Sequence, residues 1–155
     1  MNSTWRGVLV NRFSKNIDDV SGGFFFVTDE NGKTITPTFA PFYENKEYKT
    51  TFETGKVRFE NASDNVCAEV YAPYVFSGEV RRLYIKNDGE ETKKYHVVFY
   101  EDLALNFANN FASHPVFSNL FVETAKIDNN FVATRKGGKG KNDMCFVMRP
   151  VMPAS

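Results

Sequence analysis

The sequence predicts an all-β domain built as an antiparallel β-sandwich. The composition is the first indication, because 16 Phe and 7 Tyr stand among 155 residues. Aromatic and β-branched side chains suit a pleated, half-buried surface. A second indication is that about ten short apolar segments are separated by turn residues, which is typical of sandwiches. The third is that apolar and polar residues alternate with period two inside several of these segments.

The first part of the chain predicts three strands, at residues 7–10, 24–27 and 34–36. A polar loop over residues 14–21 separates the first two. Asn31 and Gly32 follow the second strand, and this pair tolerates the positive φ of a tight hairpin turn. Pro37 ends the third strand, because proline cannot donate a hydrogen bond to a sheet.

The middle of the chain predicts an antiparallel meander, with strands at residues 48–52, 56–60, 66–71, 79–87 and 93–100. In the second of these, Val57 and Phe59 alternate with charged residues. We therefore expect one buried face and one solvated face.

Residues 102–112 change character, because apolar residues recur there at spacings of three and four. This spacing predicts one short helix, with Asp102 as its N-cap. Strands are expected again at residues 120–126, 131–135 and 145–148. A glycine-rich loop over residues 137–141 precedes the last of them.

Charge and hydropathy exclude several classes of protein. Lys plus Arg and Asp plus Glu number 19 each, so the chain has no general attraction to nucleic acid. No apolar segment has the length of a membrane helix or of a signal peptide. We expect a cytoplasmic protein without direct contact to nucleic acid or membrane. Cys67 and Cys145 are expected to be reduced, buried thiols, because two cysteines make no dense disulfide framework.

No catalytic, metal or cofactor site is predicted. The two histidines, His96 and His114, have no further ligands at metal-site spacing. The loop over residues 137–141 resembles a phosphate loop superficially, but it lacks the Ser or Thr and the helix that such a loop requires. The paired acidic residues lie in or beside turns, where solubility explains them.

Several segments resemble a known family. The most specific is Ser-His-Pro-Val-Phe-Ser-Asn-Leu-Phe-Val-Glu-Thr at residues 113–124. Residues 23–29, the strand beginning Glu-Val-Arg-Arg at residues 79–82, and Ala-Thr-Arg at residues 133–135 add to it. Together they resemble the N-terminal β-sandwich of family 94 glycoside phosphorylases, formerly glycosyltransferase family 36. The resemblance is greatest to cyclic β-1,2-glucan synthases and β-1,2-oligoglucan phosphorylases. The chain departs from the family pattern after Arg135 and at residues 144–145.

The resemblance implies a super-sandwich of the galactose-mutarotase type, here incomplete. Residues 1–155 would form a single domain, a fragment of a larger carbohydrate-active enzyme. In that family the catalytic unit is an (α/α)6 barrel, which these residues do not contain. The chain is therefore expected to be no enzyme on its own and to carry no catalytic residue. It would shape the rim of the parent's active site and support dimer contacts; a synthase parent would be membrane-anchored elsewhere in its chain.

Two alternatives remain open. In the first, the chain is a free-standing carbohydrate-binding module for a β-glucan or another oligosaccharide. Such modules stack sugar rings on exposed aromatic residues, and the candidates are Trp5, Tyr43 and Tyr74, with His114 as a further ligand-facing residue. In the second, it is a structural domain that forms a homodimer, because open strand edges and zero net charge favour association.

Overall fold

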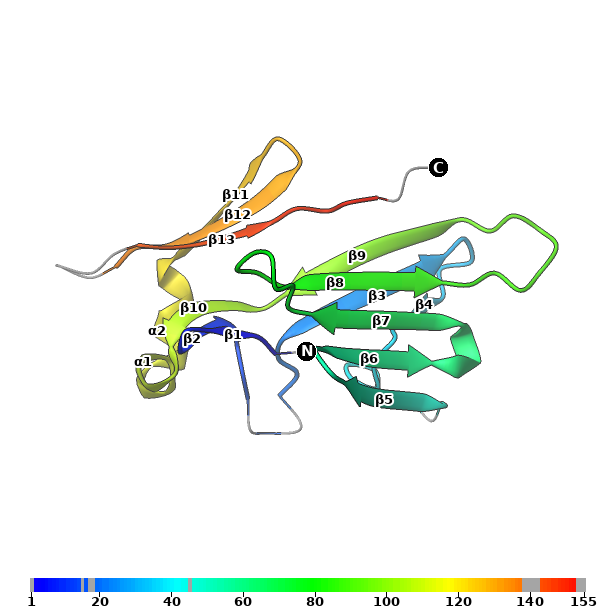
Figure 1. Ribbon diagram of the computed structural model, residues 1–155, viewed down its shortest axis with the longest axis horizontal. Coiled ribbons are helices and arrows are strands. Elements are labelled where there is room, and N and C mark those ends of the chain that lie inside the picture. Colours follow the sequence, from blue (N-terminus) through cyan, green and yellow to red (C-terminus); the bar gives the residue numbers. More distant parts are fainter. Residues whose placement is uncertain (1, 15, 17–18, 45, 138–142, 153–155) are drawn as a thin grey trace. The chain divides into compact units, whose positions relative to one another are not determined.

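The computed structural model describes residues 2–14, 16, 19–44, 46–137 and 143–152 (Figure 1). The chain divides into two compact units. Unit 1 comprises Met1–Gly23 and Glu101–Ser155, and unit 2 comprises Phe24–Tyr100. The described residues are mostly in strands, and these strands pair antiparallel. The predicted all-β class is therefore confirmed.

Unit 2 is a two-layer sandwich. One sheet has the order β4-β3-β9 and the other the order β5-β6-β7-β8. The strands are β3 (Gly23–Asp29), β4 (Thr34–Ile35), β5 (Tyr48–Glu53), β6 (Lys56–Asn61), β7 (Val66–Tyr71), β8 (Val80–Ile85) and β9 (Tyr95–Glu101). Val27 and Ile35 of the first sheet are buried against Val66 of the second, and Leu83 and Ile85 of β8 pack on this cluster. Apolar side chains from both sheets thus form one core, as the sequence predicts.

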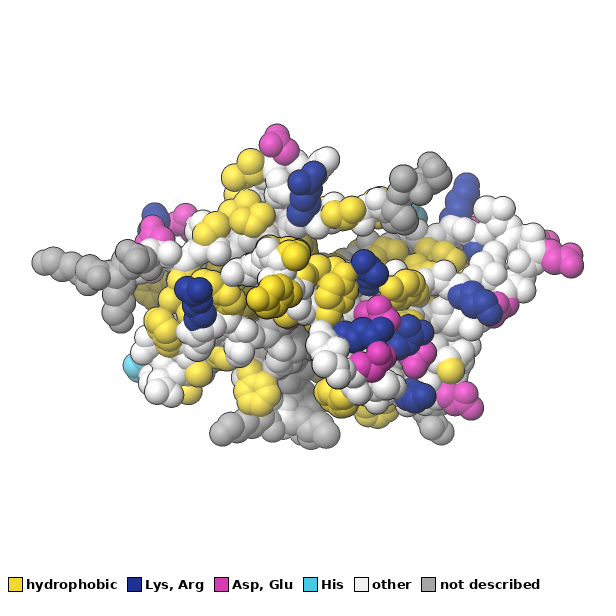
Figure 2. All heavy atoms as spheres, in the orientation of Figure 1, with side chains coloured by type: hydrophobic (Ala, Val, Ile, Leu, Met, Phe, Trp, Pro, Cys, Tyr) yellow, Lys and Arg dark blue, Asp and Glu magenta, His cyan; other side chains and the backbone are white. Residues whose placement is uncertain are grey.

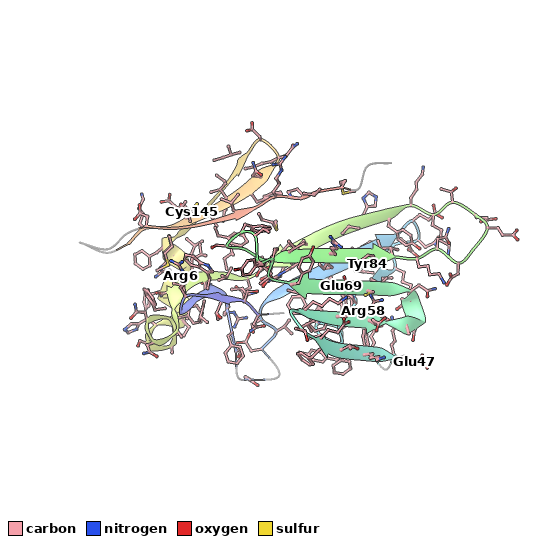
Figure 3. All side chains as sticks on the ribbon, viewed as in Figure 1. Arg6, Glu47, Arg58, Glu69, Tyr84 and Cys145 are labelled. Carbon is pink, nitrogen blue, oxygen red and sulfur yellow. The ribbon has the colours of Figure 1, made fainter. Side chains whose placement is uncertain are left out.

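The other face of the four-stranded sheet carries a network of charged side chains. Arg58, Glu69 and Arg82 lie directly opposite one another on β6, β7 and β8. The carboxylate of Glu69 accepts hydrogen bonds from Arg58 (3.0 Å) and from the Tyr84 hydroxyl (3.0 Å). Figure 3 shows Arg58, Glu69 and Tyr84 on neighbouring strands, and Figure 2 shows basic and acidic side chains gathered over them.

This network corrects one expectation from the sequence. Val57 and Phe59 were predicted to lie on a buried face and the residues between them on a solvated face. All of Lys56–Glu60 is half-buried instead. The physical reason is that the long charged side chains pair with one another and cover the face that they occupy.

The turn between β3 and β4 has the chemistry that the sequence predicts. Gly32 has a φ of 82°, in the left-handed region that favours glycine. The Asp29 carboxylate accepts hydrogen bonds from the backbone N–H groups of Asn31 and Lys33, both at 2.9 Å. Asp29 and Gly32 together fix the path of the chain from β3 into β4.

Unit 1 contains two three-stranded sheets joined by short helices. The first sheet has the order β1-β2-β10 and the second the order β11-β12-β13. The elements are β1 (Thr4–Trp5), β2 (Val8–Asn11), β10 (Leu103–Phe107), α1 (Ala108–Ser113), α2 (Pro115–Ser118), a 3-10 helix η2 (Asn119–Phe121), β11 (Val122–Ile127), β12 (Asn130–Arg135) and β13 (Met144–Met148).

The helix predicted over residues 102–112 is present only in its second half. Leu103–Phe107 form strand β10 on the edge of β2, and helix α1 begins at Ala108. Asp102 is not the N-cap. Its carboxylate pairs instead with the Arg12 guanidinium, and its backbone carbonyl accepts a hydrogen bond from the Arg12 N–H. Pairing with β2 therefore overrides the helical spacing of the apolar residues.

The two cysteines differ in environment. Cys67 on β7 is buried, as predicted, and burial raises the pKa of its thiol. Cys145 on β13 is exposed, which corrects the prediction that both thiols are buried. Most of the glycine-rich loop predicted at residues 137–141 lies outside the described residues.

Candidate functional site

Unit 1 contains a surface depression of about 430 Å³. Strand β10, helices α1, α2 and η2, and the end of strand β12 surround it. The residues that line it are Asn106, Asn110, His114, Phe117, Ser118, Phe121 and Arg135. Four of the seven belong to the segment 113–124, the most specific motif of the sequence.

A distorted strand positions the first polar group of the depression. The pairing of β10 with β2 shifts register between Leu103 and Asn106. Within this irregularity Leu105 is buried and has a φ of 45°, a strained conformation for a non-glycine residue. Bulges of this kind re-aim side chains and are common beside functional sites. Here the amide of Asn106 is buried and donates to the Ser118 hydroxyl at 3.1 Å.

Ser118 is held at the end of helix α2. Pro115 occupies the first turn of this helix, where its missing N–H has no cost. The N–H of Ser118 donates to the carbonyl of His114 at 3.1 Å, which closes the single turn. Ser118 is buried and so forms the floor of the depression together with Asn106.

Arg135 reaches the same floor because of strand register. Val122, the first residue of β11, pairs with Arg135, the last residue of β12. Since β11 follows directly on η2, this pairing places Arg135 beside the end of α2. Its Nη1 donates to the Ser118 carbonyl and, at 3.2 Å, to the Ser118 hydroxyl. The guanidinium lies 5.4 Å from the centre of the Phe121 ring, in a cation–π contact.

Burial determines the electrostatics of Arg135. Burial lowers the pKa of the guanidinium below its ordinary value. In the part of the chain that the structure describes, no carboxylate forms an ion pair with it. Arg12 is a useful contrast, because two carboxylates, Asp19 and Asp102, raise the pKa of that guanidinium.

Exposed apolar side chains follow helices α2 and η2, two of them in the lining of the depression and two next to these in sequence. The rings of Phe117 and Phe121 are more than half exposed, and their neighbours Val116 and Leu120 are 82% and 74% exposed. Exposed hydrophobic side chains are visible over β10 and α2 in Figure 2. A group of exposed apolar residues beside polar ones is typical of a surface that contacts a ligand or another protein domain. We call Val116, Phe117, Leu120 and Phe121 the apolar rim.

The residues predicted from the sequence are divided between the two units. His114 lines the depression, between the end of α1 and the start of α2. Trp5 lies on β1, about half exposed, with the Arg6 guanidinium 4.7 Å from its ring centre. It is not among the lining residues.

The two predicted tyrosines belong to unit 2 and have different surroundings. The Tyr43 ring packs edge-on against Phe39, with 5.2 Å between ring centres. Tyr74 lies in the turn between β7 and β8 and is fully exposed. The assignment of all four candidates to carbohydrate binding stays a prediction.

Sequence reasoning did not select Asn106, Ser118 or Arg135. Asn106 was not selected because residues 102–112 were predicted to form a helix, whereas Asn106 lies on strand β10. Ser118 and Arg135 were part of the segments that resemble the family, but nothing in their chemistry distinguished them from neighbouring residues. Only the register of β11 with β12 brings them together.

Unit 2 has a second, smaller hollow of about 240 Å³. Two ion pairs join four of its charged residues. Asp64 accepts from Lys33 at 2.7 Å, and Lys86 lies 2.6 Å from Asp88. These ion pairs account for the four charged side chains, and no ligand is needed to explain them. We therefore take the depression of unit 1 as the candidate site.

The described residues contain neither a candidate metal site nor a candidate membrane-spanning helix. No group of three or more His, Cys, Asp or Glu side chains in this part of the chain is arranged to hold a metal ion. None of its helices is long and apolar enough to cross a membrane.

Comparison with known families gives one match. The family model described as glycosyl hydrolase 94, supersandwich domain, matches residues 3–151. The matched region includes every residue that lines the depression. A comparison with curated proteins found no match.

Proposed function

The chain belongs to the glycosyl hydrolase 94 supersandwich family, whose domain is the non-catalytic part of these enzymes, and from this premise we propose that it holds a carbohydrate chain beside the enzyme's catalytic domain. We propose that this catalytic domain is an (α/α)6 barrel and that the carbohydrate is a β-glucan. The apolar rim would contact the barrel. The depression would then lie at the margin of the active site.

The observation that carries this proposal is the combination of side chains in the depression. Planar polar groups, namely the amides of Asn106 and Asn110 and the guanidinium of Arg135, stand beside the exposed rings of Phe117 and Phe121. Sugars offer hydroxyl groups at their edges and apolar C–H groups on their faces. Sites with a few placed polar groups and aromatic walls suit such ligands.

Titration of the purified chain with neutral gluco-oligosaccharides tests the carbohydrate role. Phe117→Ala and His114→Ala change exposed side chains, so both variants should fold, and both should weaken binding several-fold. Tyr74→Ala is the matched control, because Tyr74 is exposed and belongs to unit 2. Comparison of β-1,2- and β-1,4-linked oligomers would identify the linkage. The absence of binding at millimolar sugar would contradict this role.

A barrel-binding experiment tests the apolar rim separately. The double variant Val116→Lys with Leu120→Lys should lose association with the (α/α)6 barrel of a family enzyme, as measured by analytical ultracentrifugation. Val75→Lys with Val97→Lys adds the same charge at exposed positions of unit 2 and should retain association. The chain alone should release no sugar phosphate from glucan and phosphate, since the proposal assigns it no chemistry.

The free-standing carbohydrate-binding module is the second candidate. The full exposure of Tyr74 favours it, because a ring open to solvent can stack on a sugar. The same titration separates the two candidates. A free-standing module that uses Tyr74 would lose affinity in Tyr74→Ala and keep it in Phe117→Ala.

A further inference from the structure

Arg135 is the one permanently charged residue that lines the depression. The other lining residues are two asparagines, one serine, two phenylalanines and His114, and no acidic side chain is among them. From this geometry we propose that the depression binds an oxyanion, the phosphoryl or carboxylate group of a small ligand, through the guanidinium of Arg135. The inference rests on the proposed carbohydrate role where the phosphoryl or carboxylate group belongs to a sugar.

The Arg135 guanidinium has N–H groups that make no hydrogen bond within the described residues. Among the described residues, Nη1 alone donates to a protein acceptor, and both of its acceptors belong to Ser118. Within the described residues, Nε and Nη2 have no protein acceptor. Nε and Nη2 together form the fork that matches two oxygens of a carboxylate or phosphate. The bond to Ser118 therefore fixes the group while leaving donors for a ligand.

Three of the other arginines have the carboxylate partner that Arg135 lacks among the described residues. Arg12 pairs with Asp19 and Asp102, Arg58 pairs with Glu60 and Glu69, and Arg81 pairs with Glu79. Each of these guanidinium groups has a carboxylate that compensates its positive charge. Arg135 is partly desolvated, and no described carboxylate compensates it. Since a desolvated charge is unfavourable without a partner, an incoming oxyanion would supply the missing one.

The neighbouring side chains suit the same ligand. The amide of Asn110 on α1 is exposed and lines the depression, so its NH₂ group can donate to a further oxygen. The ring of Phe121 lies under the guanidinium and shields one side of it from water. A low local dielectric strengthens a charge-assisted hydrogen bond.

A titration followed by calorimetry tests the proposal with four probes: inorganic phosphate, glucose 6-phosphate, glucuronate and neutral glucose. We expect the three anions to bind more tightly than glucose. The ratio of glucose 6-phosphate to glucuronate affinity then identifies the phosphoryl or the carboxylate source. Arg135→Gln should weaken anion binding at least about tenfold, because it removes a charge-assisted hydrogen bond.

Asn110→Asp is a second variant that avoids any effect on folding. It places a carboxylate in the depression at an exposed helix position, so it should also abolish anion binding. Asn109→Asp adds the same charge to the same helix outside the lining residues and should bind normally. Arg149→Gln, at an exposed arginine on the chain's last described segment, controls for the loss of one positive charge.

The outcomes are distinct. Equal affinities for glucose and the anions, or equal losses in Asn110→Asp and Asn109→Asp, would overturn the oxyanion site. If neutral oligosaccharides bind while the anions do not, the inference fails and the proposed function stands. If the anions bind at Arg135 while neutral oligosaccharides do not, the oxyanion site stands and the glucan role fails.

Discussion

Asp64 is the centre of a cluster of side-chain hydrogen bonds in unit 2. Its side chain is only 7% exposed. Lys33 donates to one carboxylate oxygen at 2.7 Å, and Lys46 (2.8 Å) and Asn61 (3.0 Å) donate to the other. Burial raises the pKa of this carboxyl, but the hydrogen bonds outweigh burial and hold the pKa at about 2. The ionised form is therefore the one that the fold stabilises.

This lowered pKa predicts a pH-dependent contribution to stability. The unfolded chain binds the proton near pH 3.8, whereas the folded chain binds it only near pH 2. Stability from this group is thus complete above pH 4 and is lost as the pH falls toward 2. Asp64→Asn should lower the free energy of unfolding by about 2 kcal/mol at pH 7. The difference from the original chain should shrink between pH 4 and pH 2.

Urea unfolding at pH 7, 4, 3 and 2 measures both curves. Asp143→Asn, at an exposed residue of unit 1, is the control for removing one carboxylate. A stability difference that stays constant over this pH range would show that the hydrogen bonds, and not the ionisation of Asp64, carry the effect.

Single residues mark the limit of what the sequence alone could predict. Cys67 and Cys145 both lie in apolar-looking strands, yet one is buried and the other exposed. Their exposure depends on what packs over each strand, which no local pattern encodes. The position of Arg135 is a similar case, because its contact with Ser118 follows from the pairing of Arg135 with Val122 and from the position of η2.

At the scale of the element, the local sequence pattern was sufficient to predict the hairpin between β3 and β4. The φ of 82° at Gly32 lies in a region where a Cβ is unfavourable by about 1 kcal/mol or more. No atom lies within 4 Å of the position that a Cβ would occupy there, so the penalty comes from the backbone alone.

Gly32→Ala is therefore expected to lower the free energy of unfolding by about 1 kcal/mol. Gly89→Ala is the matched control. Its backbone is outside the left-handed region, and only the Asn87 side chain, at 3.4 Å, is near its Cβ position. Chemical denaturation of both variants checks the prediction. Equal stabilities would mean that the turn relaxes to accept a side chain.

Residues 102–112 show where a local pattern failed. Apolar spacings of three and four predict a helix throughout, but the first half pairs with β2 as strand β10. A strand that runs into a helix can reproduce such spacings over a few residues. The decision between the two depends on β2, which lies far away in sequence. The candidate site depends on the same pairing, because β10 positions Asn106.

At the scale of the whole molecule, the sandwich class followed from composition and turn chemistry, and the family followed from one specific segment. Residues 113–124 form no strand until Val122, so they contribute little to the fold class. They contribute instead most of the lining of the depression. The sequence did not predict the division into two units. The polar, linker-like loop at residues 14–21 lies close to Gly23, where the chain leaves unit 1, but no such loop marks its return at Glu101.

The last prediction concerns self-association of the whole chain. Nineteen positive and nineteen negative side chains give no net repulsion at neutral pH, and Val116 and Leu120 are largely exposed. The isolated chain should therefore associate at high concentration near pH 7, as measured by light scattering. Val116→Lys with Leu120→Lys should stay monomeric with a stability change within about 0.5 kcal/mol. Val75→Lys with Val97→Lys adds the same charge elsewhere and should still associate, so a monomer in both variants would assign the effect to charge alone.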